Sequence, residues 1–249
     1  MHDDGFFDAE VAADYDDPTD PASDPALIKA TVARLAALAD GGPALELAIG
    51  TGRIALPLAA RGIAVSGIDL SRAMVAQMRA KPGGADIPVE IGDMTTTRAN
   101  GEAGEGRFRL VYLVFNTIMN LTTQDAQVAC FENAARHLAP GGRFLIEVLA
   151  PDLQRLPPGE ALRLYHADDA GWSYDEYDVA TQAVISHHQS IVDGRLRRVS
   201  IPFRYVWPAE LDLMARIAGL ELESRWAGWN EEPFTADSRS HVSVWRRPD

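Results

Sequence analysis

The sequence contains a single cysteine, Cys130, among its 249 residues. One thiol can form neither an intrachain disulfide nor a cysteine-based zinc cluster. The first residues lack the basic and apolar regions of a secretory signal, and no apolar run approaches the roughly 18 residues of a membrane span. We therefore expect a cytoplasmic protein without a membrane partner, in which Cys130 is a buried, unreactive thiol on an amphipathic helix.

Positive charge is scarce as well. Lysine and arginine together number 23 against 36 aspartates and glutamates, which gives a formal net charge of −13. Nucleic-acid binding normally requires a basic surface, so we expect no DNA or RNA partner. The hydrophobic fraction of 47% and the chain length suffice for one folded domain with a substantial core.

Apolar runs typical of strands alternate with amphipathic helical patterns through the first 150 residues. This alternation predicts βαβ units and a parallel sheet. The predicted strands are Ala44–Ile49, Ile63–Leu70, Ile87–Ile91, Phe108–Phe115 and Arg143–Leu149. Asp24 and Ser71 are suitable N-caps for two of the intervening helices, and another helix is predicted over 123–138. The polar run 95–106 predicts a surface loop.

The pattern changes after residue 150. Alternating stretches at Ala183–Val192 and Arg195–Val206 flank the turn signal Asp193-Gly194, which predicts a β-hairpin. A helix from Pro208 to Ala218 and two last strands follow, at Leu220–Trp229 and His241–Arg246.

The predicted fold class is therefore α/β, with a doubly wound, mostly parallel seven-stranded sheet and an antiparallel β insertion after the fifth strand. We expect a single domain, 1–249, with four parts. These are an N-terminal cap and helix (1–43), a ligand-binding core (44–150), the insertion (151–207), and a C-terminal helix and hairpin (208–249).

A glycine turn, Gly50-Thr51-Gly52, follows the first predicted strand. Glycines at a strand-to-helix turn let a ligand approach bare backbone and the amides of the helix N-terminus. The turn also satisfies the dinucleotide fingerprint through Gly50, Gly52 and Ala55, with Asp69 close to where a ribose-binding acid is expected. A nicotinamide-dependent oxidoreductase is therefore one alternative.

The Tyr-x-x-x-Lys pair of short-chain reductases is absent from the sequence. Its only lysines are Lys29 and Lys81, and no tyrosine precedes either by four residues. This absence weighs against the oxidoreductase alternative.

The run ALELAIGTGRIALPLA, residues 44–59, resembles the first motif of class I S-adenosylmethionine-dependent methyltransferases. That motif has an acid near the end of the first strand, as Glu46 does here, although Ala48 stands where the family commonly has a glycine. The resemblance continues in order over roughly residues 40–150. Its later parts are Asp69 after the second strand, Asp93-Met94 after the third, FNTIMNL (115–121) after the fourth and LAPGGRFLIEV (138–148) leading into the fifth.

The resemblance implies S-adenosylmethionine as cofactor and assigns roles around it. Glu46 would serve the methionine amino end, directly or through water, Asp69 the ribose hydroxyls, and Asp93-Met94 the adenine. For Glu46, capping of nearby backbone amides is the alternative. The cofactor-binding residues that we expect are Tyr15, Glu46, Ala48, Gly50, Thr51, Gly52, Asp69, Leu70, Met74, Gly92, Asp93, Met94, Phe115 and Asn116.

The segment VAADYDD, residues 11–17, resembles the N-terminal segment that folds over the cofactor in small-molecule members of the family. It implies that Tyr15 lies by the reacting centre, and packing against the first helix is the alternative. Tyr15 and Asn116 are the catalytic candidates. Methyl transfer needs mainly alignment, and a hydroxyl acceptor would want a general base, whereas an amine needs only to be held neutral and close.

The acceptor is expected to be a small molecule. Asn116 is followed by Thr117-Ile118-Met119 and so lacks the Asn-Pro-Pro-Tyr type motif of enzymes that methylate amino groups of nucleic acids. Candidate substrate-binding residues are Asn120, His166 and Tyr205. The aromatic and polar insertion either closes the acceptor site or forms a homodimer interface. A non-catalytic protein that binds the cofactor is a further alternative.

The other titratable residues carry weaker expectations. His187 and His188 are adjacent in a strand, so only one of them can face a substrate. His137, near a helix C-terminus, is expected to be a cation favoured by the helix dipole. Asp168-Asp169 lacks a matching third ligand for magnesium, and we expect no metal.

Overall fold

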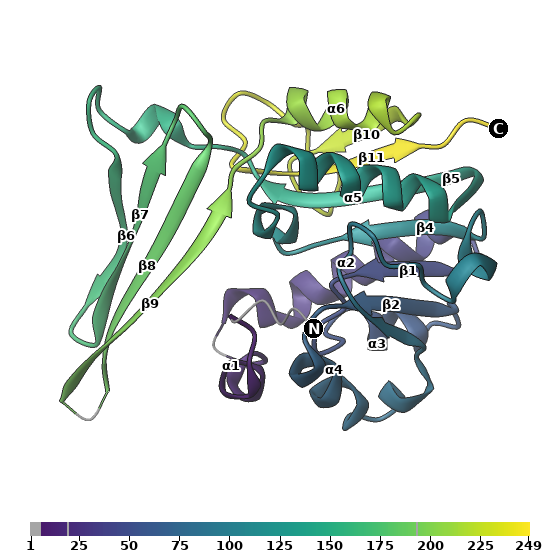
Figure 1. Ribbon diagram of the computed structural model, residues 1–249, viewed down its shortest axis with the longest axis horizontal. Coiled ribbons are helices and arrows are strands. Elements are labelled where there is room, and N and C mark those ends of the chain that lie inside the picture. The colour runs from purple at the N-terminus through teal and green to yellow at the C-terminus, as the bar shows by residue number, and fades with distance from the viewer. Residues whose placement is uncertain (1–5, 19, 193) are drawn as a thin grey trace.

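The computed structural model describes residues 6–18, 20–192 and 194–249. Two sheets organise the molecule (Figure 1): a seven-stranded sheet in the order β10-β11-β5-β4-β1-β2-β3, and a four-stranded sheet in the order β6-β7-β8-β9. The strands of the large sheet are β1 Ala44–Leu47, β2 Val65–Asp69, β3 Val89–Ile91, β4 Phe108–Leu113, β5 Leu138–Leu149, β10 Glu221–Trp226 and β11 Ser240–Arg246. Those of the small sheet are β6 Leu162–Asp168, β7 Gly171–Asp178, β8 Ala183–Val192 and β9 Arg195–Arg204. The α-helices are α1 Ala9–Asp14, α2 Pro25–Ala39, α3 Ala55–Ala59, α4 Arg72–Arg79, α5 Gln124–His137 and α6 Pro208–Ile217.

The large sheet is mostly parallel, which confirms the predicted α/β fold. Strands β1 to β5 pair in parallel, whereas β11 pairs antiparallel with β5 and β10 with β11. Side chains of successive strand residues point to opposite faces, so each face carries its own core. One core joins Leu45, Val111 and Phe144 to α5 and α6, and the other joins Ala44, Leu110 and Leu145 to α2, α3 and α4.

Three helices begin where local sequence signals place them. The Asp24 carboxylate accepts a hydrogen bond from the Ala26 amide at 2.9 Å, and Pro25 occupies the first turn. Ser71 and Thr123 cap α4 and α5 in the same way. A capping side chain satisfies one of the amides that a helix leaves without an intrahelical partner, which is why these residue types mark helix starts.

Two sequence-based expectations near the end of α5 are wrong. Strand β5 begins at Leu138, directly after the helix, and not at Arg143, because Leu138 pairs with Phe108. His137 is fully buried and is not an exposed helix-end cation. Its Nε2 accepts from the Ala99 amide at 3.0 Å, so its Nδ1 proton is donated to the Asn133 carbonyl at 2.8 Å. Burial lowers the pKa of His137, which keeps the ring neutral.

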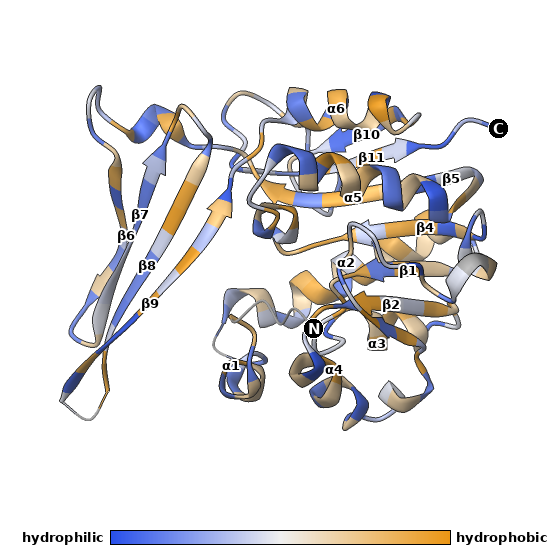
Figure 2. Ribbon diagram, viewed as in Figure 1, coloured by the Kyte–Doolittle hydropathy of each residue, from blue (hydrophilic) through white to orange (hydrophobic). Residues whose placement is uncertain are grey.

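The four-stranded sheet stands away from the rest of the molecule beyond the end of β5 (Figure 1). Strands β8 and β9 form the predicted hairpin, and Asp193 of its turn signal lies outside the described residues. Figure 2 shows apolar residues on the strands of the small sheet, and several of them, including Leu164 of β6 and Ile191 of β8, are exposed. Within the described part of the chain, none of the helices has the length and hydropathy that a membrane span requires.

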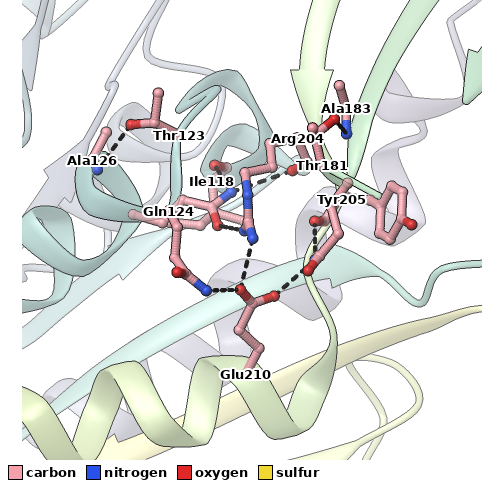
Figure 3. Close-up of polar contacts among 11 residues, drawn as sticks. Ile118, Thr123, Gln124, Ala126, Thr181, Ala183, Arg204, Tyr205 and Glu210 are labelled. Carbon is pink, nitrogen blue, oxygen red and sulfur yellow. Dashed lines mark hydrogen bonds and ion pairs between the residues drawn. The ribbon is translucent and has the colours of Figure 1, made fainter. Parts of the chain in front are cut away.

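A buried polar cluster joins the small sheet to the helices of the core (Figure 3). Arg204, at the end of β9, is 4% exposed and donates to Gln127 of α5 at 2.6 Å and to Glu210 of α6 at 2.7 Å. Glu210 also accepts from Gln124 at 2.6 Å and from Gln182 at 2.8 Å. One ion pair with neutral hydrogen-bond partners therefore sets where the insertion meets α5 and α6.

Replacing Arg204 by Met should lower the free energy of unfolding by about 3 kcal/mol, because Glu210 and the buried Gln127 lose their charged partner. Urea unfolding measures this change. Arg195→Met on the exposed part of the same strand is the control, with an expected change within about 0.5 kcal/mol. Equal losses in the two variants would show that the cluster does not stabilise the junction.

Candidate functional site

The carboxyl ends of β1 to β4 open into a cavity of about 530 Å³, here called the strand-end cavity. In open α/β sheets ligands bind beyond these ends. Its lining residues are Phe7, Tyr15, Ala48, Gly50, Asp69, Leu70, Met74, Gly92, Asp93, Met94, Phe115, Asn116, Thr117, Asn120, Leu121 and Phe203. The structure thus brings together the predicted cofactor-binding residues except Glu46, Thr51 and Gly52, and places Asn120 with them.

The glycine turn takes left-handed backbone conformations. Gly50 and Gly52 have φ angles of 55° and 76°, and Ala48 has a φ of 57°. Left-handed backbone is unstrained for glycine and costs an alanine roughly 1 kcal/mol or more. A Cβ at Gly52 would also lie 2.5 Å from the Met78 side chain. The alanine at position 48 is therefore accommodated at some cost, whereas a side chain at position 52 is not.

Asp69 connects this turn to the next one. Its carboxylate is 7% exposed and accepts from the Gly50 amide at 2.6 Å and from the Ser71 amide at 2.7 Å. The two bonds hold the turn after β1 against the start of α4. Asp69 is therefore a structural residue of the site as well as part of the cavity wall.

Glu46 lies on β1, does not line the strand-end cavity and is almost fully buried. Tyr112 of β4 is paired with Glu46 in the register of β1 and β4, and its hydroxyl donates to the Glu46 Oε2 at 2.9 Å. Burial raises the pKa of Glu46 to about 8, and the charge of Asp69 also raises it, while hydrogen bonds from Tyr112 and the Ala55 amide act in the opposite direction. The Ala55 contact is of the backbone-capping kind that was the alternative for this residue.

The N-terminal segment covers the glycine turn through Asp16. This carboxylate accepts from the Thr51 hydroxyl at 2.8 Å and pairs with Lys81 and Arg53. Burial alone would raise the pKa of Asp16, but these hydrogen bonds outweigh burial and hold it below its usual value. The segment is therefore fastened by a carboxylate that stays charged at neutral pH.

Tyr15 lies at the cavity beside this fastening. The Arg53 guanidinium is 4.8 Å from the centre of the Tyr15 ring and donates to the Tyr15 carbonyl at 2.6 Å. The ring also meets Phe7 edge to face. Burial raises the pKa of Tyr15, so its phenol is neutral at physiological pH. Sequence reasoning missed Asp16 and Phe7, although both lie within or near the acidic, aromatic N-terminal segment.

A second cavity, of about 450 Å³, lies between the core and the four-stranded sheet and is called the insertion cavity. It is lined by Asn116, Met119, Leu149, Ala150, Pro151, Asp152, Arg163, Tyr165, Asp175, Tyr177, Val184, Ser186, Phe203, Tyr205 and Arg239. Asn116 and Phe203 also line the strand-end cavity, so the two cavities meet at these residues. The predicted residue Tyr205 is therefore part of the second cavity.

The histidines of the insertion are divided between the two faces of its sheet, as expected for adjacent strand residues. His188 lies near Tyr165 and Ser186, whereas His187 stacks on Tyr174. His166 lines neither cavity, because it is exposed and its Nε2 lies 3.2 Å from Asp168. Across the described ranges, no three His, Cys, Asp or Glu side chains converge in the way that a metal ion would need. Cys130 is fully buried, and burial raises the pKa of its thiol to about 12.

Charge in the strand-end cavity distinguishes the two ligand classes that the glycine turn allows. Among its described lining residues, the charged side chains are the carboxylates of Asp69 and Asp93. A dinucleotide brings a doubly negative pyrophosphate, whereas S-adenosylmethionine carries a sulfonium and an ammonium against one carboxylate. The two carboxylates would repel the pyrophosphate and attract the sulfonium and the ammonium. The two carboxylates therefore fit S-adenosylmethionine better than a dinucleotide.

Comparison with known proteins agrees. A family model described as a methyltransferase domain matches residues 44–142. The solved structure of the CcbJ methyltransferase from Streptomyces caelestis is 35% identical, with a TM-score of 0.86 and full coverage of both chains. The chain belongs to the class I S-adenosylmethionine-dependent methyltransferases. It is therefore an enzyme whose cofactor is S-adenosylmethionine, and the oxidoreductase alternative is wrong.

Other methyltransferases share the similarity. The cypemycin N-terminal methyltransferase of Streptomyces sp. is 29% identical over 213 residues, which is 84% of each chain. The S-adenosylmethionine-bound structure of CalS10, an amino pentose methyltransferase from Micromonospora echinaspora, is 22% identical with a TM-score of 0.68, over 99% of this chain and 100% of that one. Both structural likenesses include the residues of the insertion.

Glu46 predicts a pH dependence for the cofactor-free methyltransferase. Its folded pKa, about 8, lies above its ordinary value of 4.5, so the folded state holds the proton more tightly and stability falls as pH rises between these values. Glu46→Gln removes this titration and keeps a hydrogen-bonding partner for Tyr112. Thermal melts should show the variant gaining in Tm relative to wild type from pH 5 to pH 8. Glu90→Gln on β3 is the exposed control, and parallel profiles for all three proteins would rule out a raised Glu46 pKa.

Proposed function

We propose that this methyltransferase transfers the methyl group of S-adenosylmethionine to the nitrogen of a small organic amine bound in the insertion cavity. The observation that carries the proposal is the meeting of the two cavities at Asn116 and Phe203. A cofactor in the strand-end cavity can then direct its methyl group toward a molecule in the insertion cavity. Displacement in line lowers the barrier mainly through alignment of nucleophile, methyl and sulfur.

The roles proposed around the cofactor follow the geometry of the strand ends. Asp69 would bind the ribose hydroxyls, Asp93 and Met94 would flank the adenine, and the turn at Gly50 would admit the methionine end to bare backbone. Glu46 would act from below the wall, through water or the backbone of the turn. Tyr15 and Phe115, under the Arg53 guanidinium, would enclose the sulfonium side.

The chemistry of the common wall favours nitrogen over oxygen. Neither the Asn116 amide nor the Phe203 ring can take a proton, and burial keeps the Tyr15 phenol neutral. A hydroxyl nucleophile needs a base at this point, whereas a neutral amine already carries its lone pair. That lone pair forms the new N–CH3 bond while the S–CH3 electrons return to sulfur, and the product ammonium releases its proton to water. The names of two relatives, an N-terminal methyltransferase and an amino pentose methyltransferase, also support an amine.

We further propose that residues 44–150 hold the cofactor and that 151–207 supply most of the acceptor site. The inner face of the small sheet presents Tyr177, Val184 and Phe203 in one cross-strand row, followed by Asp175 and Ser186 in the next. Aromatic and polar groups in this arrangement suit a small acceptor with an apolar body and polar substituents.

Methyl-labelled S-adenosylmethionine, offered with a panel of amino sugars and amino-acid amides and with the matched alcohols, tests the nitrogen assignment. We expect label on nitrogen, and a rate that rises with pH as the acceptor's ammonium loses its proton. Asp69→Asn serves as the cofactor-site control and should weaken S-adenosylhomocysteine binding in calorimetry about tenfold. Label on the alcohols alone would overturn the assignment to nitrogen.

The outer face of the small sheet supports a separate proposal, a homodimer formed by two copies of this face. Cross-strand pairing puts Leu162, Leu164, Trp172, Ile185, Ile191 and Leu196 on this side, and all of them are exposed. Glu176 of β7 and Arg198 of β9 also lie on this face. A two-fold axis can therefore place Glu176 of one copy opposite Arg198 of the other copy.

A Leu164→Glu substitution should dissociate this dimer, because it introduces an unpaired charge into an apolar contact. Light scattering measures the mass of wild type and variant. Leu213→Glu, an equally exposed leucine on α6, should leave the mass of a dimer unchanged. A monomeric wild-type protein, or a dimer that survives the Leu164 change, would contradict this interface.

A further inference from the structure

The turn after β4 has a strained backbone in two consecutive residues. Phe115 and Asn116 have φ angles of 55° and 62°, in the left-handed region that non-glycine residues seldom occupy. Each costs on the order of 1 kcal/mol or more, and such residues persist only when their surroundings fix them. Both line the strand-end cavity, and Asn116 also lines the insertion cavity. The strain therefore lies where the two cavities meet.

Strand β5 fixes this turn through three hydrogen bonds. The Glu147 carboxylate accepts from the Phe115 amide at 2.8 Å, and the Glu147 carbonyl accepts from the Asn116 amide at 3.3 Å. The Leu149 amide donates to the Asn116 side chain at 2.7 Å, which orients the remaining amide group of Asn116. In two of these bonds β5 contributes backbone atoms. In the third it contributes the Glu147 side chain, so a substitution of Glu147 removes that bond alone.

Glu147 itself contacts neither reactant cavity. It lines a separate cavity of about 500 Å³ on the α2 side of the sheet, together with Asp24, Trp229 and Asn230. Burial raises the pKa of Glu147, while hydrogen bonds from the Phe115 amide and the Trp229 side chain act in the opposite direction. A half-buried carboxyl that lines neither reactant cavity and accepts from the Phe115 amide can affect the reaction through that turn.

We propose that Glu147 is a positioning residue for methyl transfer, which holds the Phe115 amide and so keeps Asn116 in the conformation that aligns cofactor and acceptor. This inference rests on the proposed function in placing the acceptor in the insertion cavity. It adds a residue on the opposite face of the sheet, outside both cavities. Reaction rates are sensitive to small displacements of aligned groups, so loosening this turn should lower kcat more than cofactor affinity.

Glu147→Met and Glu147→Gln form the central comparison. Methionine is similar in length and cannot accept the Phe115 hydrogen bond well, whereas glutamine keeps a carbonyl oxygen for it. Glu232→Met is the control, because Glu232 lines the same cavity and its carboxylate accepts hydrogen bonds from Asn230, away from the turn after β4. Calorimetry with S-adenosylhomocysteine first establishes that each variant is folded and binds the cofactor product.

Glu147→Met should lower kcat about tenfold at saturating substrates, with S-adenosylhomocysteine affinity changed less than about threefold, and Glu147→Gln should restore most of kcat. Hydrogen exchange of the Phe115 amide, measured with S-adenosylhomocysteine bound, should accelerate in the methionine variant and not in the glutamine or Glu232→Met proteins. The acceptor used is the one that the labelled panel identifies. If the panel identifies an oxygen acceptor, the nitrogen proposal fails, but the test of Glu147 can still be carried out with that acceptor.

Two results would overturn the positioning role. The first is an unchanged kcat in Glu147→Met with only a lower Tm, which would make Glu147 a stabilising residue alone. The second is a loss of S-adenosylhomocysteine affinity as large as the loss in kcat, which would limit its effect to the cofactor cavity. Faster exchange at Phe115, lower kcat and preserved affinity together support the proposal.

Discussion

The carboxylate of Asp69 holds together two turns at the strand-end cavity, where we propose that the cofactor binds. Turns that follow parallel strands leave backbone amides without partners, and buried amides must find acceptors. Because β1 and β2 are parallel neighbours, their carboxyl ends lie side by side, and one carboxylate reaches both Gly50 and Ser71. The left-handed glycine turn is thus fixed by sheet register and by one side chain.

The same physical device recurs wherever a segment must be held over the strand ends. Glu147 accepts an amide from the turn after β4, Asp16 attaches the N-terminal segment to the glycine turn, and Glu210 receives Arg204 from the insertion. The first two of these bonds join residues 32 and 35 positions apart, and the third joins the end of β9 to α6. Charge-assisted bonds are stronger than neutral ones, so single residues can fix large segments. Part of the acidic composition therefore has a structural function in addition to keeping the protein soluble.

The features that sequence predicted are those set by neighbouring residues. The predicted caps at Asp24 and Ser71 depend on contacts within three positions, and the glycine turn depends on local backbone freedom. The partner of Glu46 could not be predicted, because Tyr112 is 66 residues away and meets it only through strand register. The neutral state of His137 likewise depends on the loop that brings Ala99 over it. Site geometry that arises from such long-range contacts follows from the fold alone.

The proposed division of roles between the core, which would hold the cofactor, and the insertion, which would hold the acceptor, has a chemical basis. The methyltransferase family model covers residues 44–142, which include the strand ends and the turn at Asn116, whereas most of the insertion cavity is lined by residues 149–239. An activated sulfonium needs alignment rather than a specialised acid or base, so the demand on the core is geometric. Any acceptor whose nucleophile reaches Asn116 and Phe203 can use that geometry. If the insertion holds the acceptor as proposed, its side chains can change without altering the carboxylates at the strand ends.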